Sequence, residues 1–134
     1  MDNIVLDIET DGLLDTVTKV HCIVIKTDIK LPAHAVASVE VAITEEQIKN
    51  AIQKIKLSHI IGHNVLGFDL EVLRKLYGLV IPVSQVTDTL ILSRLIHSDL
   101  RSEDASVKRL EPKFWGSHSL AAWGCRLNYN KGNF

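Results

Sequence analysis

The sequence has few cysteines and no excess of one charge sign, and both features limit the classes of protein to which it can belong. Its two cysteines, Cys22 and Cys125, lie in a strand-like and a helix-like run with nothing to pair them, so we expect buried, reduced thiols in a cytosolic protein. The formal net charge of −1 supplies no strong basic field, which counts weakly against nucleic-acid binding. A short nucleic-acid strand needs only a small groove on the protein, so nucleic-acid binding is not excluded.

Long apolar runs, internal repeats and low-complexity segments are also absent. No apolar run approaches membrane-spanning length, and the N-terminus lacks the basic region and cleavage site of a signal peptide. The 134 residues show no linker and are enough to bury a sizeable core. We therefore expect one domain over residues 1–134.

The apolar pattern predicts strands first and then strands alternating with helices, which is typical of an α/β fold with a mixed sheet flanked by helices. The three early strands predict an antiparallel meander. Capping signals occur at Thr44 with Gln47, at Gly78, at Asp88 and at Ser117. The expected segments are a strand within 4–13, strands at 18–26 and 33–41, a helix at 44–56, a buried strand at 58–61, a helix at 68–77, an extended segment at 80–86, a helix at 88–97, an exposed loop or short helical turns at 98–113, and a helix at 117–127.

Two acidic residues inside the first apolar run are the first functional signal. Asp7 and Glu9 are two positions apart, and the period of a strand places both carboxylates on one face. Such a pair repels and loses hydration unless a cation neutralises it. Mg²⁺ usually takes one or two carboxylates together with substrate phosphates, so the pattern predicts a metal-dependent phosphoryl-transfer site. The alternative is a solvated strand end.

The second signal is the segment His-Asn-Val-Leu-Gly-Phe-Asp at 63–69, where a buried strand ends and a helix begins. Sheets of α/β proteins commonly bind ligands at that position, and we expect Asn64 and Asp69 to face it. The helix macrodipole also favours the Asp69 carboxylate. The alternative is a turn residue followed by an ordinary first-turn acid, and the presence of Asp7 and Glu9 favours the site.

Together these motifs resemble a known family. Asp-Ile-Glu-Thr at 7–10 followed by His-Asn-x-x-x-Phe-Asp is similar to the first two motifs of DEDD-type 3′–5′ exonucleases. Downstream blocks at 88–98 and 116–127 resemble the proofreading domain of T7-like phage family A DNA polymerases. The four blocks occur in the family's order, and the resemblance covers nearly the whole chain.

The resemblance implies a ribonuclease-H-like fold and proofreading hydrolysis at DNA 3′ ends during phage replication, with two divalent metals, Mg²⁺ or Mn²⁺, as cofactors. By the same resemblance Asp7 would bridge both metals. Glu9 would ligate the metal that activates the attacking water, and Asp69 the metal on the leaving-group side. Thr10 and Leu13 match positions that contact the terminal nucleotide, Leu13 as an apolar wedge against the base.

Two residues of the second motif complete the expected substrate site. Asn64 matches a position near the terminal nucleotides, and His63 beside it either contacts substrate or has a structural role. The expected partner is a single-stranded or frayed DNA 3′ end, with no membrane partner. The expected location is the cytoplasm of an infected bacterial cell.

We expect structural roles for most other polar and aromatic residues. Asp88 is interpreted as an N-cap rather than a fourth metal ligand, and His118 as a packing or hydrogen-bonding residue rather than a base. Trp123, on an apolar helical face, is expected in the core. Three basic residues are expected to be solvated rather than to contact phosphates: Lys108, Arg109 and Lys113.

The third motif of the family, Tyr-x-x-x-Asp, does not occur in these 134 residues, since neither Tyr77 nor Tyr129 has Asp four positions later. In the family its Asp ligates the water-activating metal and its Tyr orients the water. The chain is a piece of a longer polymerase, a phage reading frame with its other parts encoded separately, or a truncated product that cuts poorly. A dimer partner or a second polypeptide is a further source of the missing acid.

Two other functions compete with the exonuclease. One is a residual exonuclease fold that holds DNA ends or a polymerase partner without cleaving. The other is a related DEDD exonuclease acting on RNA. The downstream blocks at 88–98 and 116–127 favour the DNA polymerase branch over the RNA enzyme.

Overall fold

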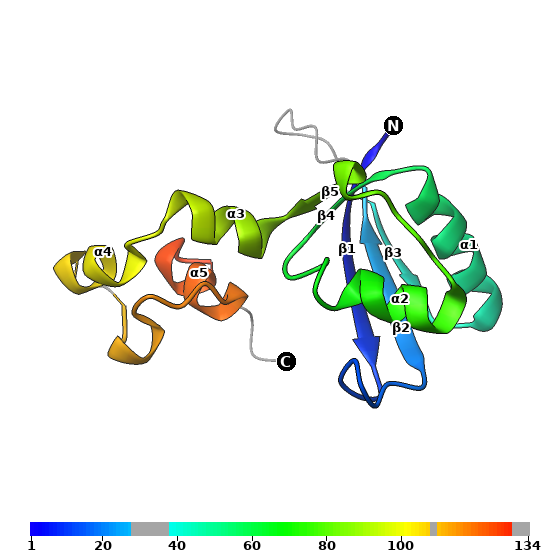
Figure 1. Ribbon diagram of the computed structural model, residues 1–134, viewed down its shortest axis with the longest axis horizontal. Helices are drawn as coiled ribbons and strands as arrows, with labels where there is room; N and C mark the ends of the chain where they lie inside the picture. Colours follow the sequence, from blue (N-terminus) through cyan, green and yellow to red (C-terminus); the bar gives the residue numbers. More distant parts are fainter. Residues whose placement is uncertain (28–37, 108–109, 130–134) are drawn as a thin grey trace. The chain divides into compact units, whose positions relative to one another are not determined.

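The computed structural model describes residues 1–27, 38–107 and 110–129. Clustering of contacts divides the chain into two compact units, Met1–Thr89 and Leu90–Phe134, which we call the first and second units. The first unit contains the sheet, and the second contains short helices and loops (Figure 1). The expectation of a single domain stays a prediction.

A five-stranded mixed sheet forms the first unit in the described part of the chain. Its order is β3-β2-β1-β4-β5, with β1, β2 and β3 antiparallel and with β4 and β5 parallel to β1. This confirms the expected antiparallel meander joined to parallel strands, and it agrees with a ribonuclease-H-like fold. The strands are β1 (Asn3–Thr10), β2 (Val20–Lys26), β3 (Val39–Ala42), β4 (His59–Gly62) and β5 (Val86–Asp88).

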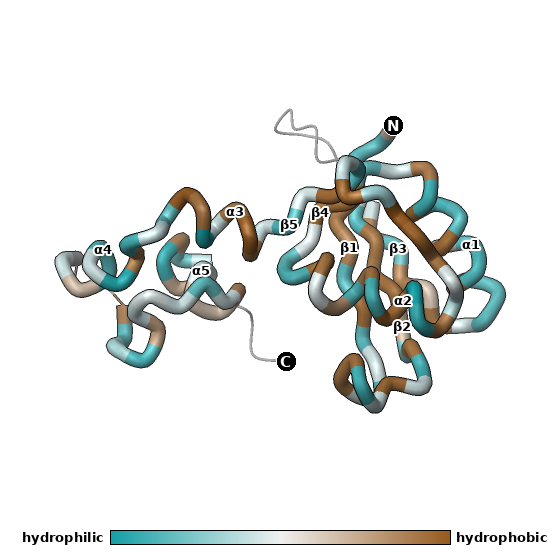
Figure 2. The backbone as a smooth tube through the Cα atoms, in the orientation of Figure 1, coloured by the Kyte–Doolittle hydropathy of each residue, from teal (hydrophilic) through white to brown (hydrophobic). Residues whose placement is uncertain are grey.

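Two helices bury one face of the sheet. Helix α1 (Glu45–Lys56) begins with the expected capping box of Thr44 and Gln47, and helix α2 (Asp69–Tyr77) ends at Gly78 with φ 66°. Both helices contribute to the hydrophobic core that also contains the inward-facing side of β1. Figure 2 shows the mixture of hydrophobic and polar residues expected of elements with one buried face.

The second unit is built from short helices. Helix α3 (Thr89–Ile96) leads into it and is followed by α4 (Leu100–Val107) and α5 (Leu120–Arg126). A 3₁₀ turn at Pro112–Phe114 separates α4 from α5, and another at Val83–Gln85 precedes β5 in the first unit. None of the described helices is long and apolar enough to span a bilayer.

Several expected boundaries were wrong in the first unit. Strand β2 starts at Val20 rather than at residue 18, because the N–H groups of Thr18 and Lys19 donate to the Asp11 carboxylate instead of to a neighbouring strand. Strand β3 covers only Val39–Ala42, and part of the expected strand at 33–41 lies outside the described residues. The segment expected to be extended over 80–86 contains the turn Val83–Gln85.

The second unit also differs from the expectations. The irregular stretch at 98–113 contains the full helix α4, and the N-cap of α5 is Ser119, whose hydroxyl accepts the N–H of Ala122. Ser117 instead contacts Ser119. The expectation of two buried thiols was wrong for Cys125, which is exposed on the short helix α5. Cys22 is half-buried.

Candidate functional site

The carboxylates of β1 lie on the face of the strand opposite the core. Ile4, Leu6 and Ile8 are buried, whereas Asp7 and Glu9 are exposed between and beyond them. In the antiparallel register Asp7 pairs with Val24 and Glu9 with Cys22. The strand period therefore places both acids on one face, as the sequence predicted.

Asp69 reaches β1 at the point where β1 and β4 separate. These two parallel strands pair only from Asn3 to Val5 on β1, and beyond that point the N–H of Ile8 donates to Asp69 Oδ1 at 3.1 Å. The Asp69 side chain is only 6% exposed. The start of α2 is therefore fixed against β1 between the two predicted ligands Asp7 and Glu9.

The environment of Asp69 disfavours its negative charge. Burial, together with the negative charges of Asp7 and Asp88, raises the pKa of its carboxyl to about 7 against the opposing effect of the backbone hydrogen bonds. In the described part of the chain Asp69 forms no ion pair with a basic side chain. The site therefore concentrates negative charge without a basic residue paired to Asp69.

These oxygen donors suit Mg²⁺ or Mn²⁺, and a cation would offset the buried charge of Asp69. Within residues 1–27, 38–107 and 110–129, however, no three His, Cys, Asp or Glu side chains form a ready-made metal cluster. The structure couples Asp7 to Asp69 electrostatically, and it does not bring Glu9 into a cluster with them.

Asp88 organises the loop that follows β4. It directly precedes α3, as an N-cap would, but its buried carboxylate also accepts the N–H groups of Asn64 and Leu66, each at 3.0 Å. Sequence reasoning missed this contact because the donors lie 24 and 22 positions away. Asp88 therefore holds the second motif in place at the carboxyl ends of β4 and β5.

Asn64 adopts a left-handed backbone conformation, with φ 61°. A Cβ atom on Gly67 would lie 2.6 Å from Asn64 Oδ1, so glycine there leaves room for the Asn64 side chain. His63 Nδ1 lies 3.0 Å from the Thr89 hydroxyl, which donates to the Gly62 carbonyl. Both contacts are satisfied together when His63 Nδ1 carries the proton, and Nε2 of the neutral ring is then an acceptor.

The other predicted substrate residues lie at the end of β1 and just beyond it. The Thr10 hydroxyl donates to the Gly12 carbonyl at 2.8 Å, and Leu13 in the loop beyond is 77% exposed. Thr10 is the last residue of β1, Leu13 follows this strand, and Asn64 follows β4. Parallel strands bring these ends to one edge of the sheet.

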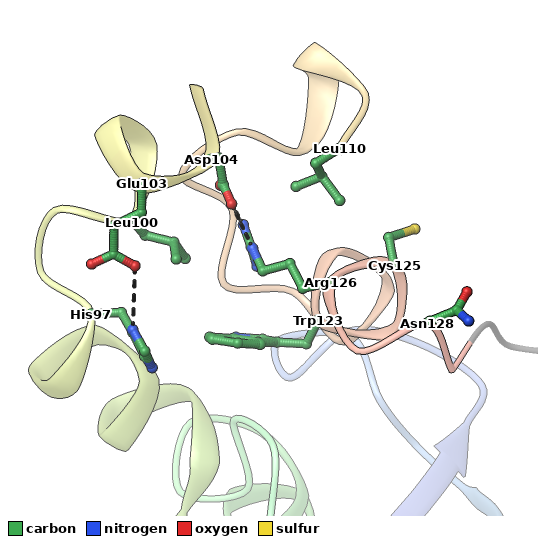
Figure 3. A pocket seen from close by; sticks show the side chains of 9 residues that line it. All are labelled: His97, Leu100, Glu103, Asp104, Leu110, Trp123, Cys125, Arg126 and Asn128. Atoms are coloured by element: carbon green, nitrogen blue, oxygen red, sulfur yellow. Dashed lines mark hydrogen bonds and ion pairs between the residues drawn. The ribbon is translucent and has the colours of Figure 1, made fainter. Parts of the chain in front are cut away.

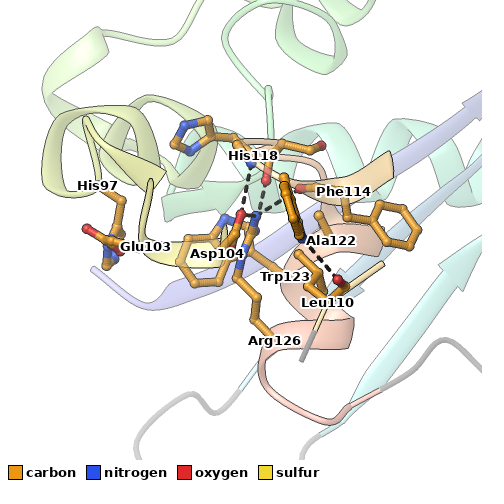
Figure 4. A network of polar contacts seen from close by, with 12 residues as sticks. His97, Glu103, Asp104, Leu110, Phe114, His118, Ala122, Trp123 and Arg126 are labelled. Atoms are coloured by element: carbon orange, nitrogen blue, oxygen red, sulfur yellow. Dashed lines mark hydrogen bonds and ion pairs between the residues drawn. The ribbon is translucent and has the colours of Figure 1, made fainter. Parts of the chain in front are cut away.

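The aromatic and basic residues of the second unit form a polar network (Figure 4). Ser93 Oγ accepts the Trp123 indole N–H at 2.8 Å and contacts His118 Nδ1 at 2.6 Å, which fits the expected hydrogen-bonding role of His118. Arg126 donates to both Asp104 oxygens, at 2.9 and 2.7 Å. Trp123 is half-buried in this network rather than a core residue.

A hollow of about 540 Å³ in the second unit contains none of the predicted site residues (Figure 3). The Arg126 guanidinium lies 4.8 Å from the centre of the Trp123 ring, and the His97 ring lies 5.1 Å from it. These two distances place Trp123 in contact with Arg126 and His97 of the same unit.

Of the three basic residues expected to be solvated, Lys113 is exposed beside Glu111, and Lys108 and Arg109 lie outside the described residues.

Comparison with known proteins relates the chain to phage polymerases. No protein-family model matches it. The chain is 36% identical to the DNA-directed DNA polymerase of Enterobacteria phage T3 over an alignment of 140 residues, which includes 98% of this chain and 20% of that protein. The DNA-directed DNA polymerase of Escherichia phage T7 shows the same 36% identity and the same coverage. The chain therefore spans about a fifth of the length of the curated relatives that it matches.

Proposed function

We propose that this chain is a metal-dependent 3′–5′ exonuclease that removes nucleotides from DNA 3′ ends, as the proofreading part of a phage-type polymerase system. The observation that carries the proposal is the buried Asp69 carboxyl fixed to β1 at Ile8, between the exposed acids Asp7 and Glu9. The similarity to the T3 and T7 DNA polymerases supports DNA as the polymer.

Each residue of the site has a role that its position can serve. Asp7 and Glu9 would hold metal from the open face of β1, and Asp69 from the start of α2. When bound, Mg²⁺ or Mn²⁺ would make hydroxide available near neutral pH and offset the charge of an in-line displacement. Leu13 and Asn64 would contact the terminal nucleotide, because both follow strand ends at the edge of the sheet where Asp69 lies.

A DNA-end-binding module that does not cleave is the second candidate. One observation favours it: the described residues contain no ready-made cluster of three metal-ligating side chains. Such a module would still hold a 3′ end through Leu13 and Asn64, or would contact a polymerase supplied by another polypeptide.

The deciding experiment is the degradation of 5′-labelled single-stranded DNA and RNA in Mg²⁺, in Mn²⁺ and in EDTA. Asp7→Ala is compared with Asp2→Ala, which removes an exposed carboxylate just before the same strand. We expect a 3′-to-5′ DNA ladder that requires metal, persists in Asp2→Ala and is absent in Asp7→Ala. A folded chain that binds the DNA but leaves it intact in both metals would contradict the exonuclease and support the binding module.

The same assay tests the metal preference. We expect Mn²⁺ to support faster cleavage than Mg²⁺, because Mg²⁺ demands near-ideal octahedral geometry and the described residues contain no ready-made cluster of three metal-ligating side chains. Initial rates at matched metal concentrations measure this preference. Equal or faster cleavage in Mg²⁺ would show that the acids of this chain suffice for a well-formed site.

A further inference from the structure

The loop between β1 and β2 holds an exposed leucine on a firmly anchored backbone. The Leu13 carbonyl accepts the N–H groups of Thr16 and Val17 at 2.9 and 2.7 Å, and Val17 is buried in the core at 2% exposure. The Leu13 side chain is nevertheless 77% exposed. A single exposed leucine is ordinary, but these hydrogen bonds and the buried Val17 restrain the backbone that carries this one.

Asp11, near the start of the loop, forms hydrogen bonds with Thr18 and Lys19 at its end. Its Oδ1 accepts the N–H groups of Thr18 and Lys19 at 2.9 and 3.0 Å, and its Oδ2 accepts the Thr18 hydroxyl. Its own N–H donates to the Lys19 carbonyl at 3.1 Å. These bonds hold the pKa of Asp11 near 2, so the carboxylate stays ionised at neutral pH.

Lys75 fastens the same loop to helix α2. Its ammonium group donates to the carbonyls of Leu14 and Asp15 at 2.8 and 3.2 Å. Among the described residues Lys75 forms no ion pair, so its ammonium group bonds to these two carbonyls rather than to a carboxylate. Lys75 lies in the helix that begins with Asp69.

We propose that Asp11 and Lys75 are positioning residues that set where Leu13 meets the terminal base of a DNA 3′ end relative to Asp69. This inference rests on the proposed function and explains how the same site would align its substrate. Helix α2 carries both Lys75, which bonds to the loop, and Asp69 at its N-terminal end. Alignment matters because a misplacement of about 1 Å can cost on the order of 100-fold in rate.

The test uses DNA with 2-aminopurine at its 3′ terminus or at an internal position. Binding in Ca²⁺ in place of Mg²⁺ reports unstacking of the base, and single-turnover cleavage in Mn²⁺ reports alignment of the phosphate. The variants are Asp11→Ala, Lys75→Met and the conservative Lys75→Arg. Two matched controls on α1 remove one exposed charge each: Glu46→Gln and Lys56→Met.

We expect Asp11→Ala and Lys75→Met to reduce the terminal 2-aminopurine signal and to slow single-turnover cleavage by roughly 10- to 100-fold. The internal 2-aminopurine signal and the affinity for DNA should change much less, and Lys75→Arg should restore most of the rate. A merely structural role would instead lower the melting temperature and leave the terminal signal of the folded fraction unchanged.

The outcomes separate this inference from the proposed function. Variants that behave like Glu46→Gln and Lys56→Met while the wild type cleaves would overturn the positioning role alone. A wild type that binds DNA and changes the terminal signal without cleaving would overturn the exonuclease and keep the positioning role. A wild type whose terminal signal does not respond to DNA, or that does not bind DNA, would overturn the positioning role.

Discussion

The carboxyl of Asp69 dominates the expected pH behaviour at the scale of single residues. Its pKa in the folded chain is about 7, compared with an ordinary value of 3.8. The folded chain holds the proton of the Asp69 carboxyl more tightly than the unfolded chain does. This carboxyl therefore contributes most to the free energy of unfolding at low pH and least at high pH. Its contribution to the free energy of unfolding therefore falls as the pH rises from about 4 to 7.

Asp69→Asn should remove this pH dependence, because an amide keeps the acceptor for Ile8 N–H without a titrating group. Between pH 5 and pH 8 in EDTA the wild type should lose up to about 3 kcal/mol more unfolding free energy than the variant. Urea unfolding of both chains, with Asp2→Asn as the control, measures the difference. Parallel pH profiles for wild type and variant would rule out the raised pKa.

Asp88 links two elements of the sheet edge through single hydrogen bonds. It lies at the end of β5, and its acceptors hold the N–H groups of Asn64 and Leu66 after β4. Since Asp88 is only 5% exposed, removing its carboxylate would leave these two N–H groups without an acceptor where water has little access. The β4–α2 loop therefore depends on a residue of the next strand.

We expect Asp88→Ala to lower the free energy of unfolding by about 2–4 kcal/mol, with Asp88→Asn intermediate because it retains one acceptor oxygen. The exposed Asp15→Ala is the control, since no side-chain contact of Asp15 is present in the described chain. Chemical denaturation measures all three. An Asp88→Ala variant as stable as Asp15→Ala would show that water replaces the carboxylate without cost.

Gly62 permits close packing at the element scale, where β4 ends beneath α2. A Cβ atom there would lie 2.6 Å from Val65 Cβ and 3.2 Å from the Leu6 carbonyl oxygen. Gly62→Ala should therefore cost about 1–3 kcal/mol through overpacking.

The matched substitution is Gly78→Ala, where a Cβ would meet open space but φ is +66°. That variant should cost about 1 kcal/mol from backbone strain alone. Thermal unfolding of the two variants compares the effects. A larger loss of stability in Gly78→Ala would mean that the residues around Gly62 shift to accept a Cβ atom at a lower cost than that of the backbone strain at Gly78.

The hydrophobic core belongs to one part of the whole molecule. Every buried member of the core cluster lies between Ile4 and Leu79, within the first unit. In the described part of the second unit the buried hydrophobic residues are Leu100, Leu110 and Ala122, and they lie beside polar contacts such as the Asp104–Arg126 pair. The first unit therefore has the means to fold without the second.

A fragment of residues 1–89 should melt cooperatively and keep its far-ultraviolet circular dichroism, whereas residues 90–134 alone should show no cooperative transition. Circular dichroism of both fragments and of the full chain measures this. A fragment 1–89 without a transition would show that the second unit contributes to the stability of the sheet.

Local patterns were enough to predict several features correctly. The strand period placed Asp7 and Glu9 on one face, and short-range caps marked the start of α1 and the end of α2. The N-cap of α5 was misplaced by two residues, because Ser117 and Ser119 have the same intrinsic capping preference. Propensity does not separate two serines that close together.

The remaining features depended on contacts between distant parts of the chain. Asp69 meets Ile8 across 61 positions, and Asp88 holds Asn64 across 24. Strand order decides such contacts, because it determines which loop ends lie at the same edge of the sheet. Periods and caps involve neighbours within about four residues, so they determine elements and faces. Which carboxylate is buried, and what it holds, was decided only when the sheet formed.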